Sequence, residues 1–268
     1  MSVKLLVVGL AAASVVLAAG SAQARINALP TRTPGTLTVG VDIGAPGLAQ
    51  GTVVNGKVVN AKGFEINLAR VLAHKLGLRL RIINVPFAHV ISAGAKPFDV
   101  SIAHVTITSE RRRSVAFSPP YLVVNKGVLV APGVEPPATL AELRKLRICA
   151  QRSTTSLAYV RTTLRPTRPP HTFVSLIDEL IAVADGYCQA MIADLEIIVG
   201  AKREHPDLYG PIAGQIETHE HYGAVFQKGP KLKRPVSAAL MSLAHTGVVK
   251  RLENRWFGKG WDNVSVLK

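Results

Sequence analysis

The sequence predicts an α/β fold made of two layered units with a ligand cleft between them. Three observations predict it: strand-like and helix-like segments alternate in the first half of the chain, the alternation restarts after Pro132-Gly133, and polar residues follow several strands. Alternation of this kind favours parallel strands joined by right-handed crossovers. Because open parallel sheets bind ligands at the carboxyl ends of their strands, two such units predict a cleft between them.

The first unit opens with a strand at Thr36 to Asp42, which is rich in β-branched residues. A loop rich in Gly, Asn and Val follows. Residues 63–77 then predict an amphipathic helix that ends at Gly77, because apolar residues recur every four positions, at Phe64, Leu68, Leu72 and Leu76. Further strands are expected at residues 78–85 and 98–106.

The second unit spans roughly residues 129–220. Helices are expected at residues 139–145, 153–164 and 175–184, and strands at residues 146–151 and 187–193. Residues 221–227 resemble one more strand, and helical stretches fill the remainder of the chain.

The N-terminus carries the signals of export. A short basic start at Met1 to Lys4 precedes an uncharged apolar run from Leu5 to Ala19, and Ala22-Gln23-Ala24 has the small-x-small pattern of a cleavage site. We therefore expect a cleavable signal peptide at residues 1–24. A membrane anchor is the alternative, but the apolar run is shorter than the roughly 20 residues that a span needs.

The charge balance is strongly basic. The formal net charge is +15, and it falls to +14 without the leader, whose one charged residue is Lys4. The basic residues are scattered along the chain, and no zinc-finger spacing accompanies them. This distribution indicates solubility and attraction for anions, and it argues against a nucleic-acid partner.

A first candidate anion site is the segment TSERRR. Thr108 has the character of an N-cap, so Arg111 would lie in the first helical turn beside free backbone N–H groups. A planar guanidinium matches a carboxylate with two parallel hydrogen bonds. Consecutive helical residues point about 100° apart, so Arg111, Arg112 and Arg113 cannot all face one site. Periodicity alone leaves open which one does.

Two further candidates stand at strand ends. Residues 151–155, QRSTT, offer hydroxyls and backbone N–H groups at a helix start, although Ser and Thr also serve there as ordinary caps. Asp194 ends the apolar strand MIA. It could accept hydrogen bonds from a ligand ammonium or cap the helix that follows.

Seven segments, in order, resemble the periplasmic solute-binding proteins of the polar amino-acid ABC importers (solute-binding protein family 3): GTLTVGVD, GFEINLARVLAHKLG, FDVSIAHVTITSERRRSVAFSPPYL, ICAQRSTTS, DGYCQAMIAD, HYGAVFQKG and LENRWFG. They cover most of the chain after the leader. The resemblance implies two α/β lobes joined by two crossover strands that close like a Venus flytrap, the type 2 periplasmic binding protein fold. It implies a first lobe at residues 25–128 plus 222–268 and a second lobe at residues 129–221.

The resemblance also assigns roles within the cleft. The arginine of the family's TxxR segment clamps a ligand carboxylate, and it corresponds to Arg111 here. Asp194 stands where an acid takes the α-ammonium. The remaining ligand-binding positions that it implies are Thr106, His104, Ser153 and Thr154. No cofactor, metal or catalytic residue is implied.

The chain departs from the family pattern at three places. The Pro-Pro-aromatic run that often follows the first strand is replaced by Ala45-Pro46-Gly47-Leu48, which removes an aromatic wall at Gly47-Leu48. His104 stands at a usually small residue, and Ser153 stands at the usual Gly. Phe87 could provide a substitute wall, or it could be a core residue.

Two cysteines and two histidines also bear on the predicted structure. Cys149 and Cys188 fall on strands that should be neighbours in the second lobe, so the resemblance favours a disulfide over two buried thiols. His219 and His221 lie two apart on a probable strand. This pair offers too few ligands for a metal site, and we expect a solvated hinge segment instead.

The expected function is therefore that of a monomeric, non-enzymatic periplasmic receptor. It would capture an amino acid or a similar small carboxylate and deliver it to an ABC permease in the inner membrane. The alternative is an enzyme on the same fold, such as a cyclohexadienyl dehydratase-like lyase. That reading needs a general acid with a raised pKa in the cleft, for which Glu196 is the nearest candidate.

Overall fold

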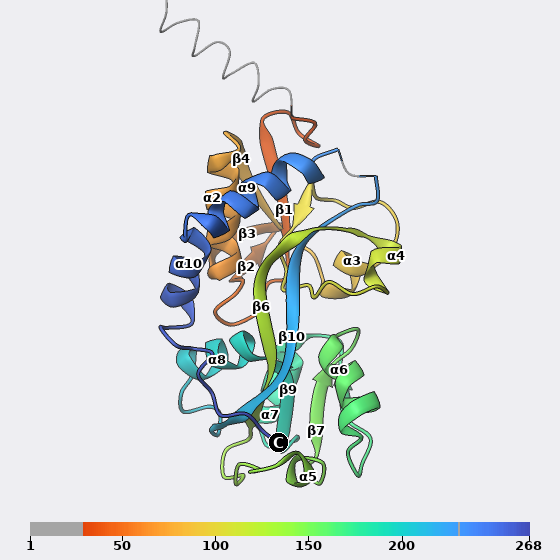
Figure 1. The fold of residues 1–268 in the computed structure, drawn as a ribbon, viewed down its shortest axis with the longest axis vertical. Coiled ribbons are helices and arrows are strands. Elements are labelled where there is room, and N and C mark those ends of the chain that lie inside the picture. Colours follow the sequence, from red (N-terminus) through yellow and green to blue (C-terminus); the bar gives the residue numbers. More distant parts are fainter. Residues whose placement is uncertain (1–28, 230) are drawn as a thin grey trace, which may run out of the picture.

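Two α/β lobes are joined by a pair of long strands in the computed structural model, which describes residues 29–229 and 231–268. The predicted signal peptide at residues 1–24 lies outside these residues. Figure 1 shows the lobes stacked along the long axis of the molecule, with β6 (Ala116–Val130) and β10 (Ile212–Phe226) running side by side between them. The predicted α/β fold with two crossover strands is confirmed.

A single eight-stranded sheet passes through both lobes, in the order β4-β1-β5-β10-β6-β9-β7-β8. The strands at each end of this order pair in parallel, as the alternation of elements predicts. The two long strands pair with each other in antiparallel fashion at the centre. The sheet is therefore mixed, because the chain must cross from one lobe to the other and return.

The first lobe is built on three parallel strands, β1 (Thr36–Val41), β4 (Arg79–Asn84) and β5 (Val100–Ser101). Helix α2 (Phe64–Lys75) packs against this layer together with α9 (Lys233–His245) and α10 (Val248–Trp256). The short helices α3 (Phe87–Ile91) and α4 (Arg111–Ser114) lie on the side of the lobe away from α10 (Figure 1).

The second lobe holds β7 (Ile148–Gln151), β8 (His171–Phe173) and β9 (Ala190–Asp194). Its helices are α5 (Leu140–Leu143), α6 (Thr155–Tyr159), α7 (Leu176–Ala184) and α8 (Leu195–Glu204), with a π-helical turn η1 (Val160–Leu164) directly after α6. The chain end returns to this lobe, since Leu267 packs in its core and the Leu267 N–H donates to Gln215 O at 2.8 Å.

Three elements differ from the sequence-based expectation. The loop after the first strand contains a two-stranded hairpin, β2 (Gln50–Val54) and β3 (Lys57–Lys62). Strand β6 passes through Pro119 and Pro120, residues that argue against a strand because proline donates no ladder hydrogen bond. Within the expected strand at residues 98–106, only β5 is a regular strand; the following residues form part of the cleft wall and keep a single bridge to β10, between Thr106 and Tyr222.

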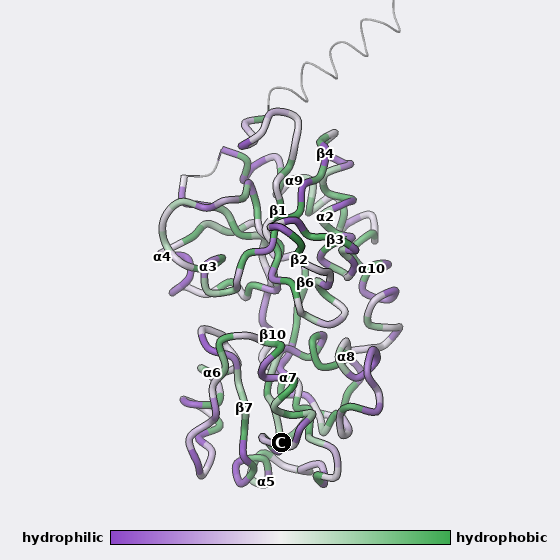
Figure 2. The backbone as a smooth tube through the Cα atoms, turned by 180° about the vertical axis from the view of Figure 1, so that it is seen from behind, coloured by the Kyte–Doolittle hydropathy of each residue, from purple (hydrophilic) through white to green (hydrophobic). Residues whose placement is uncertain are grey.

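Hydrophobic residues concentrate along the inner strands, β7 among them, whereas the outer loops are largely hydrophilic (Figure 2). The second lobe is also crosslinked by the Cys149–Cys188 disulfide, with the two Cα atoms 5.9 Å apart. Cys149 lies in β7, and Cys188 lies two residues before β9 rather than on it. The expected disulfide is confirmed.

The start of α2 brings a carboxylate into the interior. Gly63 precedes the helix at φ 125°, and a Cβ there would meet Leu48 O at 2.1 Å, so only glycine fits. The helix then turns Glu65 into the core, where the side chain is fully buried. A buried carboxylate requires partners, and the cleft provides them.

Candidate ligand-binding site between the lobes

A cavity lies between the lobes and is lined from both of them. Its first-lobe wall consists of Phe87, His104, Thr106 and Arg111, and its second-lobe wall of Gln151, Thr154, Thr155, Ser156, Leu176, Glu179, Ile192, Ala193, Asp194 and Ile197. Five of the six residues expected at the site line it. The sixth, Ser153, lies beside it, in an adjoining groove that it shares with Arg111 and Thr154.

Arg111 bridges the two walls. Its Nη1 donates to Thr106 O at 2.8 Å in the first lobe, and its Nη2 donates to Ser153 O at 3.0 Å in the second. The side chain is 8% exposed, and the guanidinium carbon lies 5.3 Å from the centroid of the Phe87 ring. Among the residues that the structure describes, no carboxylate oxygen lies within 4.0 Å of this guanidinium.

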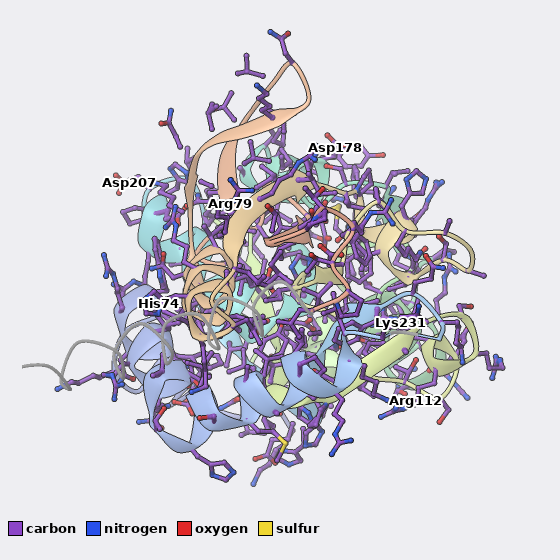
Figure 3. All side chains as sticks on the ribbon, turned by 90° about the horizontal axis from the view of Figure 1, so that it is seen from above. His74, Arg79, Arg112, Asp178, Asp207 and Lys231 are labelled. Carbon is purple, nitrogen blue, oxygen red and sulfur yellow. A yellow bond between two sulfur atoms is a disulfide. The ribbon has the colours of Figure 1, made fainter. Side chains whose placement is uncertain are left out.

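The side chains of the three consecutive arginines point in different directions, as the helical geometry predicts. Arg111 is buried at the cavity, whereas Arg112 and Arg113 are exposed. Figure 3 shows Arg112 at the outer edge of the molecule, and its guanidinium carbon lies 5.7 Å from the Phe117 ring centroid. Thr108 caps the turn, since its Oγ1 accepts the Arg111 N–H at 3.1 Å, although α4 itself begins two residues later than expected.

Asp194 does not cap the helix that follows it. The side chain makes no capping hydrogen bond in α8, and its two oxygens contact Lys126 Nζ and the Tyr222 hydroxyl instead. Burial alone would raise the pKa of Asp194, but the charge of Lys126 and the hydrogen bonds from Lys126 and Tyr222 lower it. Asp194 is therefore an ionised carboxylate facing the cavity.

Lys126 completes a buried charge cluster behind Asp194. Its Nζ lies 2.9 Å from Glu220 Oε2 and donates to Thr155 Oγ1 at 2.6 Å. Burial lowers the pKa of Lys126, but the nearby Asp194 and Glu220 carboxylates outweigh this effect and raise it. The lysine is therefore charged, and it is fully buried.

Glu220 joins the lobes at the crossover strands. Its Oε2 accepts hydrogen bonds from Thr106 Oγ1 in the first lobe and Thr155 Oγ1 in the second, both at 2.7 Å. Because Glu220 lies on β10, this contact connects both cavity walls to a strand that crosses between the lobes. The Thr106 hydroxyl therefore faces Glu220 and carries an internal hydrogen bond.

His104 is held in place by Glu65. The backbone N–H of His104 and the Tyr121 hydroxyl both donate to Glu65 Oε1, and the ring nitrogen Nδ1 of His104 lies 3.4 Å from Glu65 Oε2. Burial lowers the pKa of His104, but Glu65, Asp42 and Asp194 outweigh this and raise it to about 9. The imidazole ring is therefore protonated at neutral pH, and its Nε2 has no hydrogen-bond partner among the described residues.

Phe87 supplies an aromatic surface to the cavity. Its ring stacks on His104 with the centroids 5.4 Å apart and the planes 11° from parallel. Phe87 also packs in the first lobe with Val90 and Phe98, so it is both a core residue and a wall of the cavity. The segment at residues 45–48, which lacks the aromatic residue common in the family, does not line this cavity. Leu48 is fully buried, and Gly47 lies against Gly200 of α8.

Ser153 and Thr154 shape the start of α6. Ser153 adopts φ 64°, the left-handed conformation that glycine favours, which explains why a glycine suits this position. Thr154 caps the helix by accepting the Leu157 N–H at 3.1 Å, and its hydroxyl donates to Gln151 O at 2.7 Å. The capping interpretation of Thr154 therefore fits its geometry, and the residue lines the cavity as well.

Two buried glutamates differ in their access to the cavity. Glu179 lines the second-lobe wall, and burial raises its pKa to about 8; its Oε1 has no partner in the described part of the chain. Glu196 is fully buried behind Tyr222, whose hydroxyl contacts it, and it is not among the cavity-lining residues. Burial and the charge of Asp194 raise the pKa of Glu196 to about 8.

His219 and His221 are exposed on β10 within the segment that crosses between the lobes. No group of three or more His, Cys, Asp or Glu side chains that could hold a metal ion occurs within residues 29–229 and 231–268. Across the same residues, no helix combines the length and apolar character needed to cross a bilayer.

Sequence reasoning missed Lys126, Glu179, Glu220 and Tyr222. A signal existed for two of them. Lys126 interrupts an otherwise apolar strand, LVVNKGVLV, and Glu179 falls on the apolar face of its helix, three residues from both Leu176 and Ala182. A charged residue at a core position indicates a buried partner. The partners themselves are distant in sequence and emerge only from the fold.

The fold and the cavity are those of a two-lobed binding protein. The model of the bacterial extracellular solute-binding proteins, family 3, matches residues 37–259. The chain belongs to this family, and its fold is that of the type 2 periplasmic binding proteins.

Two relatives of the chain are named as amino-acid-binding proteins. The arginine-binding extracellular protein ArtP of Bacillus subtilis is 25% identical over 205 residues, covering 74% of this chain and 78% of ArtP. The L-cystine-binding protein TcyJ of Escherichia coli is 26% identical over 238 residues, covering 84% of this chain and 83% of TcyJ.

Two solved structures are similar across most of the chain. An ancestral arginine-binding protein bound to arginine has a TM-score of 0.73 and 26% identity, covering 84% of this chain and 99% of that protein. The ancestral amino acid-binding protein AncCDT-1, a precursor of cyclohexadienyl dehydratase, has a TM-score of 0.70 and 26% identity, covering 83% and 95% of the two chains.

Proposed function

We propose that this protein is the extracytoplasmic receptor of an ABC importer and that it captures an amino acid or a similar small carboxylate between its lobes. Arg111 is the clamp for the ligand carboxylate, with Thr106, His104, Ser153, Thr154 and Asp194 around it. The proposed first lobe is residues 25–128 plus 222–268, and the second is residues 129–221, to which the chain end at Leu267 also returns. The two lobes of one monomer close on the ligand in the periplasm.

This proposal rests on the surroundings of the Arg111 guanidinium. A buried guanidinium satisfied by two carbonyl oxygens still lacks a counter-ion, and burying such a charge is unfavourable. Burial lowers the pKa of Arg111, although Asp194, Glu220 and other anions nearby oppose the effect. A ligand carboxylate would supply the missing charge and a bidentate hydrogen-bond partner. It would also contact both lobes, because Arg111 spans them.

Transport is supported by the relatives. Their names describe an arginine-binding protein, an L-cystine-binding protein and an ancestral amino acid-binding protein that is a precursor of cyclohexadienyl dehydratase. The ligands in these names differ from one another. The names therefore support a receptor function, and the identity of the ligand has to be inferred from the residues of the cavity. The permease in the inner membrane is the expected partner, and no cofactor is required.

The test is a thermal-shift and calorimetric screen of the exported chain against amino acids and small carboxylates. A ligand that binds only the folded state at 100 times its Kd should stabilise it by about 2.7 kcal/mol. Arg111→Ala should remove this stabilisation. Arg113→Ala, which alters an exposed neighbour, should retain it. Retained affinity in Arg111→Ala, or lost affinity in Arg113→Ala alone, would show that the clamp is assigned to the wrong residue.

The enzyme alternative has one test of its own. Glu196, the acid expected for this role, is behind Tyr222 and off the cavity wall, so a ligand in the cavity would not touch it. Incubation with prephenate should therefore leave the substrate unchanged when it is followed by ultraviolet absorbance. Turnover by the wild-type chain that Glu196→Gln abolishes would establish the lyase function instead.

A further inference from the structure

We propose that the cavity selects a carboxylate that lacks an α-ammonium group, such as an α-hydroxy or α-oxo acid, because Lys126 already occupies the cation position beside Asp194. This inference rests on the proposed function and narrows its ligand class. It concerns the chain's own residues, and it departs from the amino acids that the relatives' names describe.

Lys126 is bound as an ammonium ligand would be. An ammonium offers three donors, and Lys126 Nζ has three acceptors: Asp194 Oδ1, Glu220 Oε2 and Thr155 Oγ1. The lysine is anchored on β6 directly opposite Asp194 in the strand register. The side chain has no exposed surface.

Both oxygens of the Asp194 carboxylate are correspondingly engaged. One oxygen contacts Lys126, and the other accepts from the Tyr222 hydroxyl. A ligand ammonium brought to Asp194 would meet a carboxylate whose charge is already paired, with a second cation immediately behind it. Like charges at such a separation repel, and burial strengthens the repulsion. The position therefore offers an amino group little stabilisation.

The groups that remain unsatisfied fit an anion with a neutral polar substituent. Arg111 faces the cavity without a carboxylate partner in the described residues. His104 Nε2, which lies 3.9 Å from Asp42 Oδ2, and Glu179 Oε1, on opposite walls, make no hydrogen bond there. A carboxylate satisfies Arg111, whereas a hydroxyl or oxo group can accept from a protonated His104 and exchange a hydrogen bond with Glu179.

Titration calorimetry of the disulfide-intact wild-type chain at pH 7 provides the test. The probes are L-amino acids matched with their α-hydroxy analogues: alanine with lactate, aspartate with malate, and arginine with argininic acid. Each pair keeps the carboxylate and the side chain, and it changes only the α-substituent. In the pair that binds most tightly, we expect the hydroxy acid to bind at least tenfold more tightly than the amino acid.

A variant links this preference to Lys126. Lys126→Gln removes the charge but keeps hydrogen-bond donors, so it should shift the affinity ratio at least tenfold toward the amino acid. Lys250→Gln is the control, because Lys250 is exposed and its one ion pair within the described residues is with Glu253, and it should leave the ratio unchanged. Should Lys126→Gln fail to fold, as judged by circular dichroism, the wild-type ratio alone decides.

The three outcomes are distinct. Preference for the hydroxy acid supports the inference. Equal or tighter binding of the amino acid overturns it and leaves the receptor function intact. Absence of binding to every probe overturns the proposed capture of small carboxylates, and the inference fails with it.

Discussion

The pairing of individual buried charges determines which ligand groups the cleft can bind. Each buried charge needs a partner of opposite charge, and the protein supplies one for some of these residues and not for others. Asp194 and Glu220 have Lys126, and Glu65 has His104 and Tyr121. Arg111 is the buried cation of the cavity wall that has only carbonyl oxygens. The distribution separates charges that are paired within the fold from Arg111, which we propose binds the ligand carboxylate.

Removing Lys126 should destabilise the fold. Lys126→Met leaves the buried Asp194 and the half-buried Glu220 without their shared cation, and the expected loss in the free energy of unfolding is about 3–5 kcal/mol. Denaturant unfolding followed by circular dichroism measures it. Lys145→Met, at an exposed position, should stay within about 0.5 kcal/mol of wild type. An equally mild effect at Lys126 would mean that the cluster contributes no net stability.

Glu179 should make stability depend on pH. Its pKa is about 8 in the folded chain against an ordinary 4.5, so between these values the folded state keeps a proton that the unfolded state has lost. The free energy of unfolding therefore falls as the pH rises through this window. In Glu179→Gln the decline from pH 5 to pH 8 should be smaller by about 1–3 kcal/mol.

Urea unfolding at a series of pH values measures this decline. Asp178→Asn is the matched control, because Asp178 lies on the same helix but points to solvent (Figure 3). Glu196 titrates in the same window and accounts for the slope that remains in Glu179→Gln. An unchanged slope in that variant would show that Glu179 is ionised in the folded protein.

At the scale of elements, the second-lobe strands rely on a covalent link as well as on packing. The disulfide joins β7 to the turn before β9 across a sequence separation of 39 residues. Both sulfur-bearing side chains are fully buried within the hydrophobic cluster that includes Leu180 and Met191. The link therefore secures the two neighbouring strands, β7 and β9, whose ends carry Gln151 and Asp194 into the cavity.

Loss of this disulfide should lower stability. Closing a loop of this length restricts the unfolded chain by about 3–4 kcal/mol, so the Cys149→Ala, Cys188→Ala double variant should be less stable by that order. Guanidinium unfolding with and without reductant provides the measurement. Reductant should destabilise wild type and leave the double variant unchanged. Equal stability of oxidised and reduced wild type would contradict the expected contribution.

At the scale of the whole molecule, contacts that cross between the lobes surround the cavity. Arg111 reaches Ser153 O, Glu220 accepts from Thr106 and Thr155, and Gly47 N donates to Glu204 at 3.0 Å. These contacts hold a closed arrangement around β6 and β10. A ligand that adds bonds to both walls would favour it further, since binding shifts the population toward the state that it contacts.

Closure by the ligand should be measurable as a distance. Non-natural amino acids carrying fluorophores at the exposed positions 113 and 161, one in each proposed lobe, avoid the cysteines. Energy transfer between them should increase when the tightest probe is added. The same pair in an Arg111→Ala background should respond only weakly. A ligand that binds calorimetrically without altering the transfer would show that capture does not depend on lobe closure.

The sequence by itself determined the α/β rhythm, the strand-end location of the site, the family and the divergence of Arg111 from its neighbours. These features follow from local periodicity, capping residues and segments of a few consecutive positions. Only the tertiary structure decided that Asp194 is paired with Lys126, that Glu65 raises the pKa of His104, and that Phe87 forms a cavity wall. Such pairs join residues 17 to 68 positions apart. Their energies depend on burial and on distances that no local pattern encodes.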